Sequence, residues 1–283
     1  MTDGDVMDVI KVGFVKLGNI GSAPLLEFLL DERADRNDID VRVVSSGAKL
    51  NPEQAEEVAK KILDFKPNLV ITVSPNAALP GPGKVREIMA DAGIPLIVVS
   101  DAPGKKIKED VEAKNQGYII VNADAMIGAR REFLDPTEMA LFNADVIRVL
   151  AATGAFSVIY HEIDKVIEQI KKGEKPELPR IIITKNKAVD ALNFKNPYAY
   201  AKALAAYEIA SAVADLSVEG CFKIQEAEKY IPIVAGAHEM MRVAAKLADE
   251  ARELEKSGDT IVRRPHKKSG EILTKTALLQ KPS

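Results

Sequence analysis

Short β-rich runs alternate with amphipathic helical segments through the first half of this 283-residue chain. The runs are nearly continuous in apolar character and rich in β-branched residues, which is typical of parallel strands buried on both faces. They occupy residues 9–15, 39–44, 69–73, 96–99 and 118–121. Because alternating strands and helices form right-handed crossovers, the pattern predicts an α/β fold with a Rossmann-like, mostly parallel sheet and helices on both faces.

Helix starts can be recognised between these runs. Asn51 followed by Pro52 is a helix N-cap with proline at the first helical position. Further helices are expected to open at residues 22–24 and to cover residues 83–92. Each has apolar residues at helical spacing, so one face of each helix is expected to pack on the sheet.

The second half changes to a helical pattern. Asp135 and Glu138 form a capping box, with helical character continuing to about residue 172 and a bend expected at Gly154. Two more helices are expected over residues 196–216 and from near 233 to 256. These helices predict a bundle beside the sheet.

Three parts follow from this change of pattern. Residues 1–127 are expected to form an α/β coenzyme-binding domain, and residues 128–258 a mostly helical domain. Residues 259–283 are expected to form a basic, β-like tail. The apolar run at 180–184 is a candidate strand of the first sheet, which leaves the first boundary open.

Composition excludes several classes of protein. Hydrophobic residues make up 47% of the chain, which argues against disorder, and the net charge of −3 offers no general field for nucleic acid. The charge is uneven, because residues 259–283 carry six basic against two acidic side chains. This tail, in which 260–262 and 272–278 are expected to pair as a hairpin, is interpreted either as a solvated segment or as a contact for an anion or a subunit.

The cysteine and histidine content argues against a disulfide or a metal site. Cys221 is the single cysteine, and the three histidines are scattered along the sequence. No zinc signature can be recognised, and His238 is interpreted as a packing or helix-surface residue. No run has the length of a membrane span and no signal peptide is recognisable, so a cytoplasmic protein without a membrane partner is expected.

Small polar loops follow all five predicted strands. Because ligands of open parallel sheets bind beyond the carboxyl ends of the strands, these loops are candidates for one shared crevice. The loops are residues 16–21, 45–47, 74–77, 100–104 and 122–124. Their glycines and prolines would let a ligand approach the backbone, although ordinary turn chemistry explains each loop taken singly.

The first loop resembles a dinucleotide fingerprint only in part. Gly18 and Gly21 precede a helix and offer backbone N–H groups to an anion. Lys16, however, stands where the first glycine of the fingerprint belongs, and residues 45–47 lack the acidic residue that would bind an adenosine ribose. Residues 81–84 lack the glycine and hydroxyl residue of a phosphate-binding P-loop. These departures argue against NAD and against a P-loop nucleotidase.

Charged side chains near the same edge are candidates for chemistry. Asp101, Lys105 and Lys106 surround a tight turn after the fourth strand, where a solvated turn is the alternative. Asp135 and Glu138 lie where the two main parts of the chain join, and a cleft between domains is a natural coenzyme site. Both also have a structural explanation as a helix cap.

Together these segments resemble the coenzyme F420-dependent methylenetetrahydromethanopterin dehydrogenases of methanogenic archaea. The resemblance covers essentially the whole chain, and its specificity comes from several segments together. They are residues 16–21, 74–76, 100–103, 130–136 and 236–239.

The resemblance implies a reversible reaction of methanogenesis from carbon dioxide. Methylene-tetrahydromethanopterin would give a hydride to oxidised coenzyme F420, a deazaflavin, yielding methenyl-tetrahydromethanopterin and reduced F420. It also implies no metal, no flavin prosthetic group, and a homo-oligomer that is a hexamer built as a trimer of dimers. Because the coenzymes carry the chemistry, the protein would supply position and electrostatics.

The donor carbon becomes cationic, so a nearby carboxylate would stabilise it, and Asp101, Asp135 and Glu138 are the candidates. The candidate coenzyme contacts are basic side chains and small loop residues at the same edge: Lys16, Gly18, Asn19, Gly21, Ser45, Ser74, Asn76, Ser100, Lys105, Lys106 and Arg130. Two alternatives stay open, an NAD(P)-linked dehydrogenase and a non-catalytic α/β ligand-binding protein.

Overall fold

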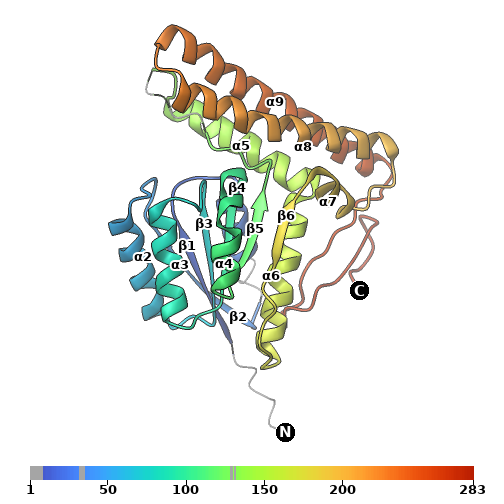
Figure 1. Cartoon of the computed structure of the whole chain (residues 1–283). Coiled ribbons are helices and arrows are strands. Elements are labelled where there is room, and N and C mark those ends of the chain that lie inside the picture. The colour runs from blue at the N-terminus through green and yellow to red at the C-terminus, as the bar shows by residue number, and fades with distance from the viewer. Residues whose placement is uncertain (1–8, 32–35, 128–129, 131) are drawn as a thin grey trace.

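The structure is a computed structural model that describes residues 9–31, 36–127, 130 and 132–283. An α/β layer carries a layer of long helices at one end of its strands, and the C-terminal segment runs back along the side of the α/β layer (Figure 1). The helical layer therefore lies over the strand ends.

Six parallel strands form one sheet in the order β2-β1-β3-β4-β5-β6. Every residue of β3, β4 and β5 is buried, as expected for strands rich in Val and Ile that helices cover on both faces. The five predicted strand runs are confirmed, and the candidate strand near 180–184 pairs in parallel with β5. The strands are β1 Ile10–Lys16, β2 Ile39–Ser45, β3 Leu69–Ser74, β4 Leu96–Asp101, β5 Gly117–Val121 and β6 Arg180–Ile183.

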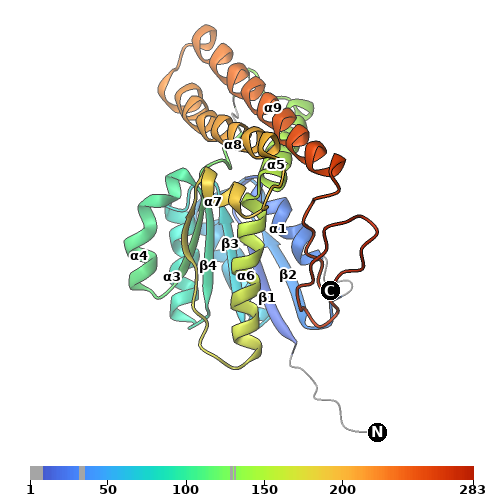
Figure 2. The same cartoon turned by 90° about the vertical axis from the view of Figure 1, so that its right-hand side faces the viewer.

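Helices cover both faces of this sheet, as predicted (Figure 2). On one face lie α2 (Pro52–Asp64), α3 (Pro80–Asp91) and α4 (Lys108–Ala113), whose buried side chains form one apolar cluster with the sheet. On the other face lie α1 (Ser22–Asp31) and α6 (Ala155–Lys171), which belong to a second, larger cluster. The sheet is thus the middle layer of the α/β part.

The helical layer consists of α5 (Pro136–Thr153), α8 (Pro197–Val218) and α9 (Ala227–Ser257), which lie across the carboxyl ends of the strands (Figures 1 and 2). The shorter α7 (Lys185–Asp190) and the π-helical turn η3 (Glu219–Lys223) join its parts. Small side chains let α8 and α9 approach closely, because alanines dominate their buried faces. These alanines are Ala199, Ala203, Ala206 and Ala210 of α8 and Ala237, Ala244, Ala245, Ala248 and Ala251 of α9.

The predicted N-caps are confirmed, whereas only the first bond of the capping box predicted for Asp135 and Glu138 is found, because the Glu138 carboxylate contacts His238. Asn51 accepts a hydrogen bond from a backbone N–H in the first turn of α2, and Asn196 does so in α8. Asp135 accepts from the N–H of Glu138 at 2.7 Å, with proline at the first position of α5. Each cap satisfies a backbone donor that the helix leaves unpaired.

The bend expected at Gly154 is also present. α5 ends and α6 begins at this residue, with 70° between the two helices. Gly154 has φ of +99°, and a Cβ atom there would lie 2.1 Å from the carbonyl oxygen of Ala188. Only glycine fits this corner, so the chain can turn from the helical layer down onto the sheet.

Several boundaries differ from the sequence prediction. α9 begins at Ala227, not near residue 233, and Pro232 lies inside it. Pro232 is the sixth residue of α9, so its missing N–H removes one backbone hydrogen bond inside the helix. The 3₁₀ segment η2 (Ala102–Ile107), α4 and α7 were not predicted, since each is too short to show a hydrophobic period.

The basic tail forms less regular structure than the predicted hairpin. Its two arms meet only at isolated antiparallel bridges, Arg263 with Lys275 and His266 with Ile272. Asn37 donates its N–H to the carbonyl of Lys268 at 2.7 Å, which ties the tail to the segment before β2. The tail therefore depends on packing against the α/β layer more than on a ladder of its own.

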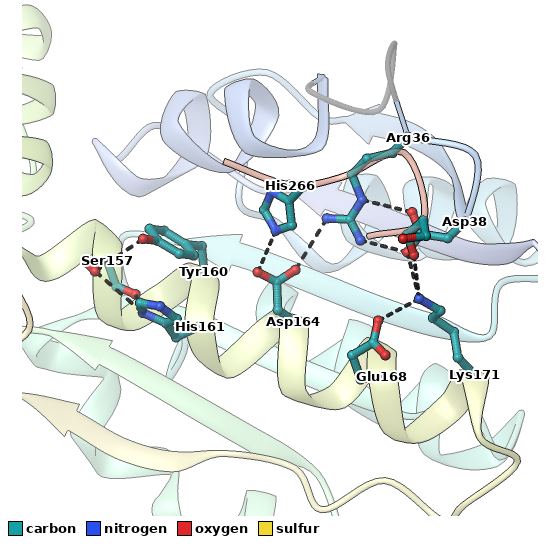
Figure 3. A network of polar contacts seen from close by, with 10 residues as sticks. Arg36, Asp38, Ser157, Tyr160, His161, Asp164, Glu168, Lys171 and His266 are labelled. Carbon is teal, nitrogen blue, oxygen red and sulfur yellow. Dashed lines mark hydrogen bonds and ion pairs between the residues drawn. The ribbon is translucent and has the colours of Figure 1, made fainter. Parts of the chain in front are cut away.

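A buried polar network fastens this tail to α6 and to the start of β2 (Figure 3). His266 Nε2 lies 2.9 Å from the carboxylate of Asp164 on α6. Arg36 makes two contacts of 2.9 Å with Asp38 and one of 3.4 Å with Asp164. Lys171 reaches Asp38 at 3.2 Å. Buried charges need such partners, so each side chain depends on the others.

Burial would raise the pKa of Asp38, but hydrogen bonds from Arg36 and Lys171 outweigh it, and the pKa lies below its usual value. Asp38 is therefore ionised at neutral pH, which suits its position between two basic side chains.

No single described helix has the length and apolar character needed to cross a membrane. The bent pair α5 and α6 passes the test jointly, by length and composition only.

Candidate active site

The strand order of the sheet indicates where on its carboxyl edge a ligand would bind. The chain leaves β1 towards β2 and then returns past β1 to β3, so the strand order reverses between β1 and β3. Ligands of open α/β sheets bind at such a switch point. Since the helical layer lies over the same edge, the candidate site is between the strand ends and α5, α8 and α9 (Figure 1).

The loops predicted to share a crevice do meet at this edge. Gly18 has φ of +76°, and a Cβ atom there would lie 3.1 Å from Pro75 and 3.2 Å from Leu50. The N–H of Gly18 donates to the carbonyl of Gly47 at 3.0 Å. Glycine is therefore required where the loops after β1, β2 and β3 touch.

Side chains predicted to contact coenzyme also shape these loops. Ser100 is fully buried, and its hydroxyl accepts the N–H of Ala77 at 3.0 Å. Ser45 accepts the N–H of Gly47 at 3.0 Å, and Asn76 that of Ala78, also at 3.0 Å. These bonds hold the loops in place, whether or not a ligand also touches the same residues.

Asp124, which follows β5, occupies the N-terminus of α1. It is fully buried, and its two carboxylate oxygens accept the N–H groups of Gly21 at 2.5 Å and Ser22 at 2.9 Å. The positive end of the helix dipole favours a carboxylate there. Burial nevertheless raises the pKa of Asp124 to about 6. Both Gly18 and Gly21, suggested as donors to an anion, thus donate their N–H groups within the chain.

Asp101 lies at the end of β4, beneath the helical layer. Its side chain is 2% exposed and accepts the N–H of Ala102 at 2.6 Å, which caps η2. Burial raises the pKa of Asp101 well above its usual value, and nearby Asp124 adds to this effect. Tyr207 of α8 donates its hydroxyl to the carbonyl of Ile183 at 2.6 Å, so a polar bond ties the helical layer to the sheet.

The first turn of α5 contacts the middle of α9 through a polar pair. Glu138 Oε1 lies 2.7 Å from Nδ1 of His238, which is 5% exposed. Two aromatic rings enclose the imidazole, Phe133 at 4.9 Å and Phe142 at 4.3 Å between ring centroids. Burial lowers the pKa of His238 despite the neighbouring carboxylate. The structure therefore gives His238 a specific carboxylate partner, beyond the packing role expected from the sequence.

The remaining predicted side chains differ in accessibility. Lys105 and Lys106 are exposed on η2, Lys16 and Asn19 are half-buried, and Ser74 is buried. The two exposed lysines can meet an anionic ligand without leaving water.

Arg130 lies where the α/β part passes into the helical part, and it contacts the helical part. Its guanidinium lies 3.9 Å from the ring centroid of Tyr230 and donates to the carbonyl of Ile224 at 2.8 Å. It therefore holds the segment that leads into α5 against the start of α9.

Two functional candidates were missed by sequence reasoning. Asp124 was noted only as part of a polar loop, and its signal was a carboxylate directly after a buried strand at the ligand edge. His238 offered no local signal, because its partner lies 100 residues away. In the described residues no group of three His, Cys, Asp or Glu side chains is placed to bind a metal ion.

The comparisons with known proteins agree on one family. A family model described as methylene-5,6,7,8-tetrahydromethanopterin dehydrogenase matches residues 10–283. The F420-dependent methylenetetrahydromethanopterin dehydrogenase of Archaeoglobus fulgidus is 64% identical over 274 residues, which is 97% of this chain and 99% of the relative. The enzyme of the same name from Methanocaldococcus jannaschii is 58% identical over 275 residues, with the same coverage.

A solved structure is similar over nearly the whole chain. It is that of an F420-dependent methylene-tetrahydromethanopterin dehydrogenase in complex with methylene-tetrahydromethanopterin and coenzyme F420. The TM-score is 0.94 at 50% identity, covering 97% of this chain and 100% of the other. The α/β fold and the resemblance inferred from the sequence are confirmed. With the family model spanning all but its first nine residues, the chain belongs to the methylene-tetrahydromethanopterin dehydrogenase family.

Proposed function

We propose that this chain catalyses reversible hydride transfer from methylene-tetrahydromethanopterin to oxidised coenzyme F420. The products are methenyl-tetrahydromethanopterin and reduced F420. One observation carries this conclusion: the fold superposes over 97% of its length on an F420-dependent enzyme whose structure contains both coenzymes. Identity of 64% to a relative with that activity in its name supports the same assignment.

The chain's own groups would bind, orient and stabilise charge. Loss of the hydride leaves a cation on the donor carbon, and a fixed carboxylate lowers the free energy of that state. Of the three candidates, Asp135 is exposed and engaged as a helix cap. Asp101 is buried with a raised pKa, which favours its neutral form. Glu138, with 27% of its side chain exposed, combines access with a fixed orientation.

Coenzyme binding is proposed for the loops at the switch point and for the basic side chains beside them. Lys105 and Lys106 are exposed on η2 and suit the phosphate and glutamates of the F420 side chain. We include Ser45, Ser74, Asn76 and Ser100 of the strand-end loops among the proposed contacts, together with Lys16, Gly18, Asn19, Gly21 and Arg130. Hydride transfer itself needs no side-chain nucleophile, because the coenzymes exchange the hydride directly.

The division of labour between the parts of the chain is also a proposal. Residues 1–127 with the strand at 180–184 would supply the coenzyme loops, and residues 128–258 would cover them. Exposed apolar side chains of α5, η3 and α9 support assembly into a homo-oligomer, proposed as a hexamer working in the cytoplasm. These side chains are Met139, Leu141, Phe222 and Val243. Light scattering on the purified chain measures the subunit number.

A spectrophotometric assay tests the activity. The absorbance of oxidised F420 is expected to fall when methylene-tetrahydromethanopterin is added, and NAD or NADP is expected not to replace F420. Turnover with NADP in place of F420 would favour the NAD(P)-linked alternative. Binding of both coenzymes without any change in absorbance would favour a non-catalytic ligand-binding protein.

A further inference from the structure

A histidine stands on the buried face of α9 where an apolar residue would pack. Its neighbours on that face include Val234, Ala237 and Met241, and His238 itself is 5% exposed. Burying an imidazole costs free energy unless its polar atoms are hydrogen-bonded. The ring therefore needs an explanation beyond filling space between α9 and α5.

The contacts of the ring fix which nitrogen carries the proton. Nδ1 lies 2.7 Å from Oε1 of Glu138, an acceptor, so Nδ1 carries the hydrogen and donates it. No residue that the structure describes bonds Nε2, which suits the lone pair of a neutral ring better than a second N–H. Phe133 and Phe142 pack on the ring and hold its orientation.

Glu138 lies on the accessible side of this pair. Its side chain is 27% exposed, whereas that of His238 is 4% exposed. It sits in the first turn of α5, where its N–H is already fixed by the carboxylate of Asp135 at 2.7 Å. Backbone and side chain are thus both held, and a rigid carboxylate needs no reorganisation when positive charge develops beside it.

We propose that His238 is a positioning residue, whose Nδ1–H holds the carboxylate of Glu138 towards the carbon of methylene-tetrahydromethanopterin that loses the hydride. The inference rests on the proposed function and adds separate roles for Glu138 and His238. Glu138 stabilises the cation formed, and His238 acts only through Glu138. The pair thus supports turnover more than coenzyme binding.

Substitutions at position 238 separate this role from simple packing. His238→Leu keeps an apolar group of similar size but removes the donor, so kcat is expected to fall on the order of 10- to 100-fold. The KM for each coenzyme is expected to change by less than about twofold. His238→Asn places an amide N–H near the position of Nδ1, so most of the lost kcat is expected to return. His161→Leu, on α6, is the matched control with unchanged kcat.

A double-mutant cycle tests whether the histidine works through the carboxylate. Glu138→Gln alone is expected to lower kcat, and adding His238→Leu is expected to lower it no further than about twofold. Glu138 is partly exposed, so this arm remains informative even if His238→Leu fails to fold.

Three results would overturn the inference. They are an unchanged kcat in His238→Leu or Glu138→Gln, equal losses in His238→Leu and His238→Asn, or an additive double mutant. A wild-type chain that binds both coenzymes without turnover would instead overturn the proposed function itself.

Discussion

The pKa of Asp124, a residue beside the β1–β3 switch point, provides the most stringent test of the site's electrostatics. Burial and hydrogen bonding shift this pKa in opposite directions. The N–H groups of Gly21 and Ser22 favour its ionised form, whereas complete burial favours the neutral form. Burial is the larger effect, and the pKa rises from 3.8 to about 6. The substitution Asp124→Asn removes the titration and keeps the shape of the side chain.

A pKa shift of about two units corresponds to a contribution of about 3 kcal/mol from Asp124 to the free energy of unfolding. The folded chain binds the proton of Asp124 more tightly than the unfolded chain does. The resulting stability is fully present below about pH 4 and is lost as the pH rises through about 6. The free energy of unfolding of the wild type minus that of Asp124→Asn is therefore expected to fall by about 3 kcal/mol between those limits.

Urea unfolding followed by far-ultraviolet circular dichroism measures this difference, at one protein concentration and several pH values. Asp38→Asn is a matched control, in which the stability difference from the wild type is expected to change with pH in the opposite direction. Because the pKa of Asp38 is lowered, the stability it adds is present above its unfolded pKa and lost as the pH falls. A wild-type-minus-Asp124→Asn difference that stays flat or grows with pH would refute the reasoning. It would mean that hydrogen bonds from the start of α1 outweigh burial.

Three further substitutions test other parts of the molecule. Asp101→Ala is expected to cost about 1 kcal/mol of stability through the lost cap and to reduce turnover less than Glu138→Gln does, and a larger loss of turnover would favour Asp101 over Glu138 as the charge-stabilising carboxylate. Asp164→Ala leaves His266 without its carboxylate and is expected to cost about 3–5 kcal/mol, with faster tryptic cleavage of the tail. Lys105→Ala and Lys106→Ala are each expected to raise the KM for F420, by a factor that shrinks as salt is added.

The α/β half could be predicted from the sequence because its determinants are local. Mostly apolar runs of four to seven residues, rich in Val and Ile, mark strands, and Asn51 and Asp135 mark helix starts through bonds to residues three positions away. Gly154 marks the corner, since only glycine adopts its backbone angle without strain. The predicted loops at the carboxyl edge follow from the same local signals.

Strand order and polar pairing could not be predicted, because they depend on contacts between distant residues. Asp124 bonds to Gly21 across 103 positions, and His238 bonds to Glu138 across 100. The tail gave a similar difficulty. Its basic side chains suggested a solvated segment or a contact for an anion or a subunit, whereas His266 docks against Asp164, 102 residues before it. A single sequence shows residue types at these positions but not their partners.

Asp124 also gives a physical meaning to the departures from a dinucleotide fingerprint. In the sequence these were Lys16 in place of glycine and the missing acidic residue after β2. In the structure, the N–H groups at the start of α1 that would receive a pyrophosphate already bond a buried carboxylate of the chain itself. A pyrophosphate would have to displace Asp124 and approach its negative charge. In dinucleotide-binding proteins the positive end of this helix binds the pyrophosphate, whereas here it binds the carboxylate of Asp124 and so connects the end of β5 to α1. We therefore expect the start of α1 to bind a pyrophosphate poorly, and we propose that the loops and basic side chains around it select the deazaflavin.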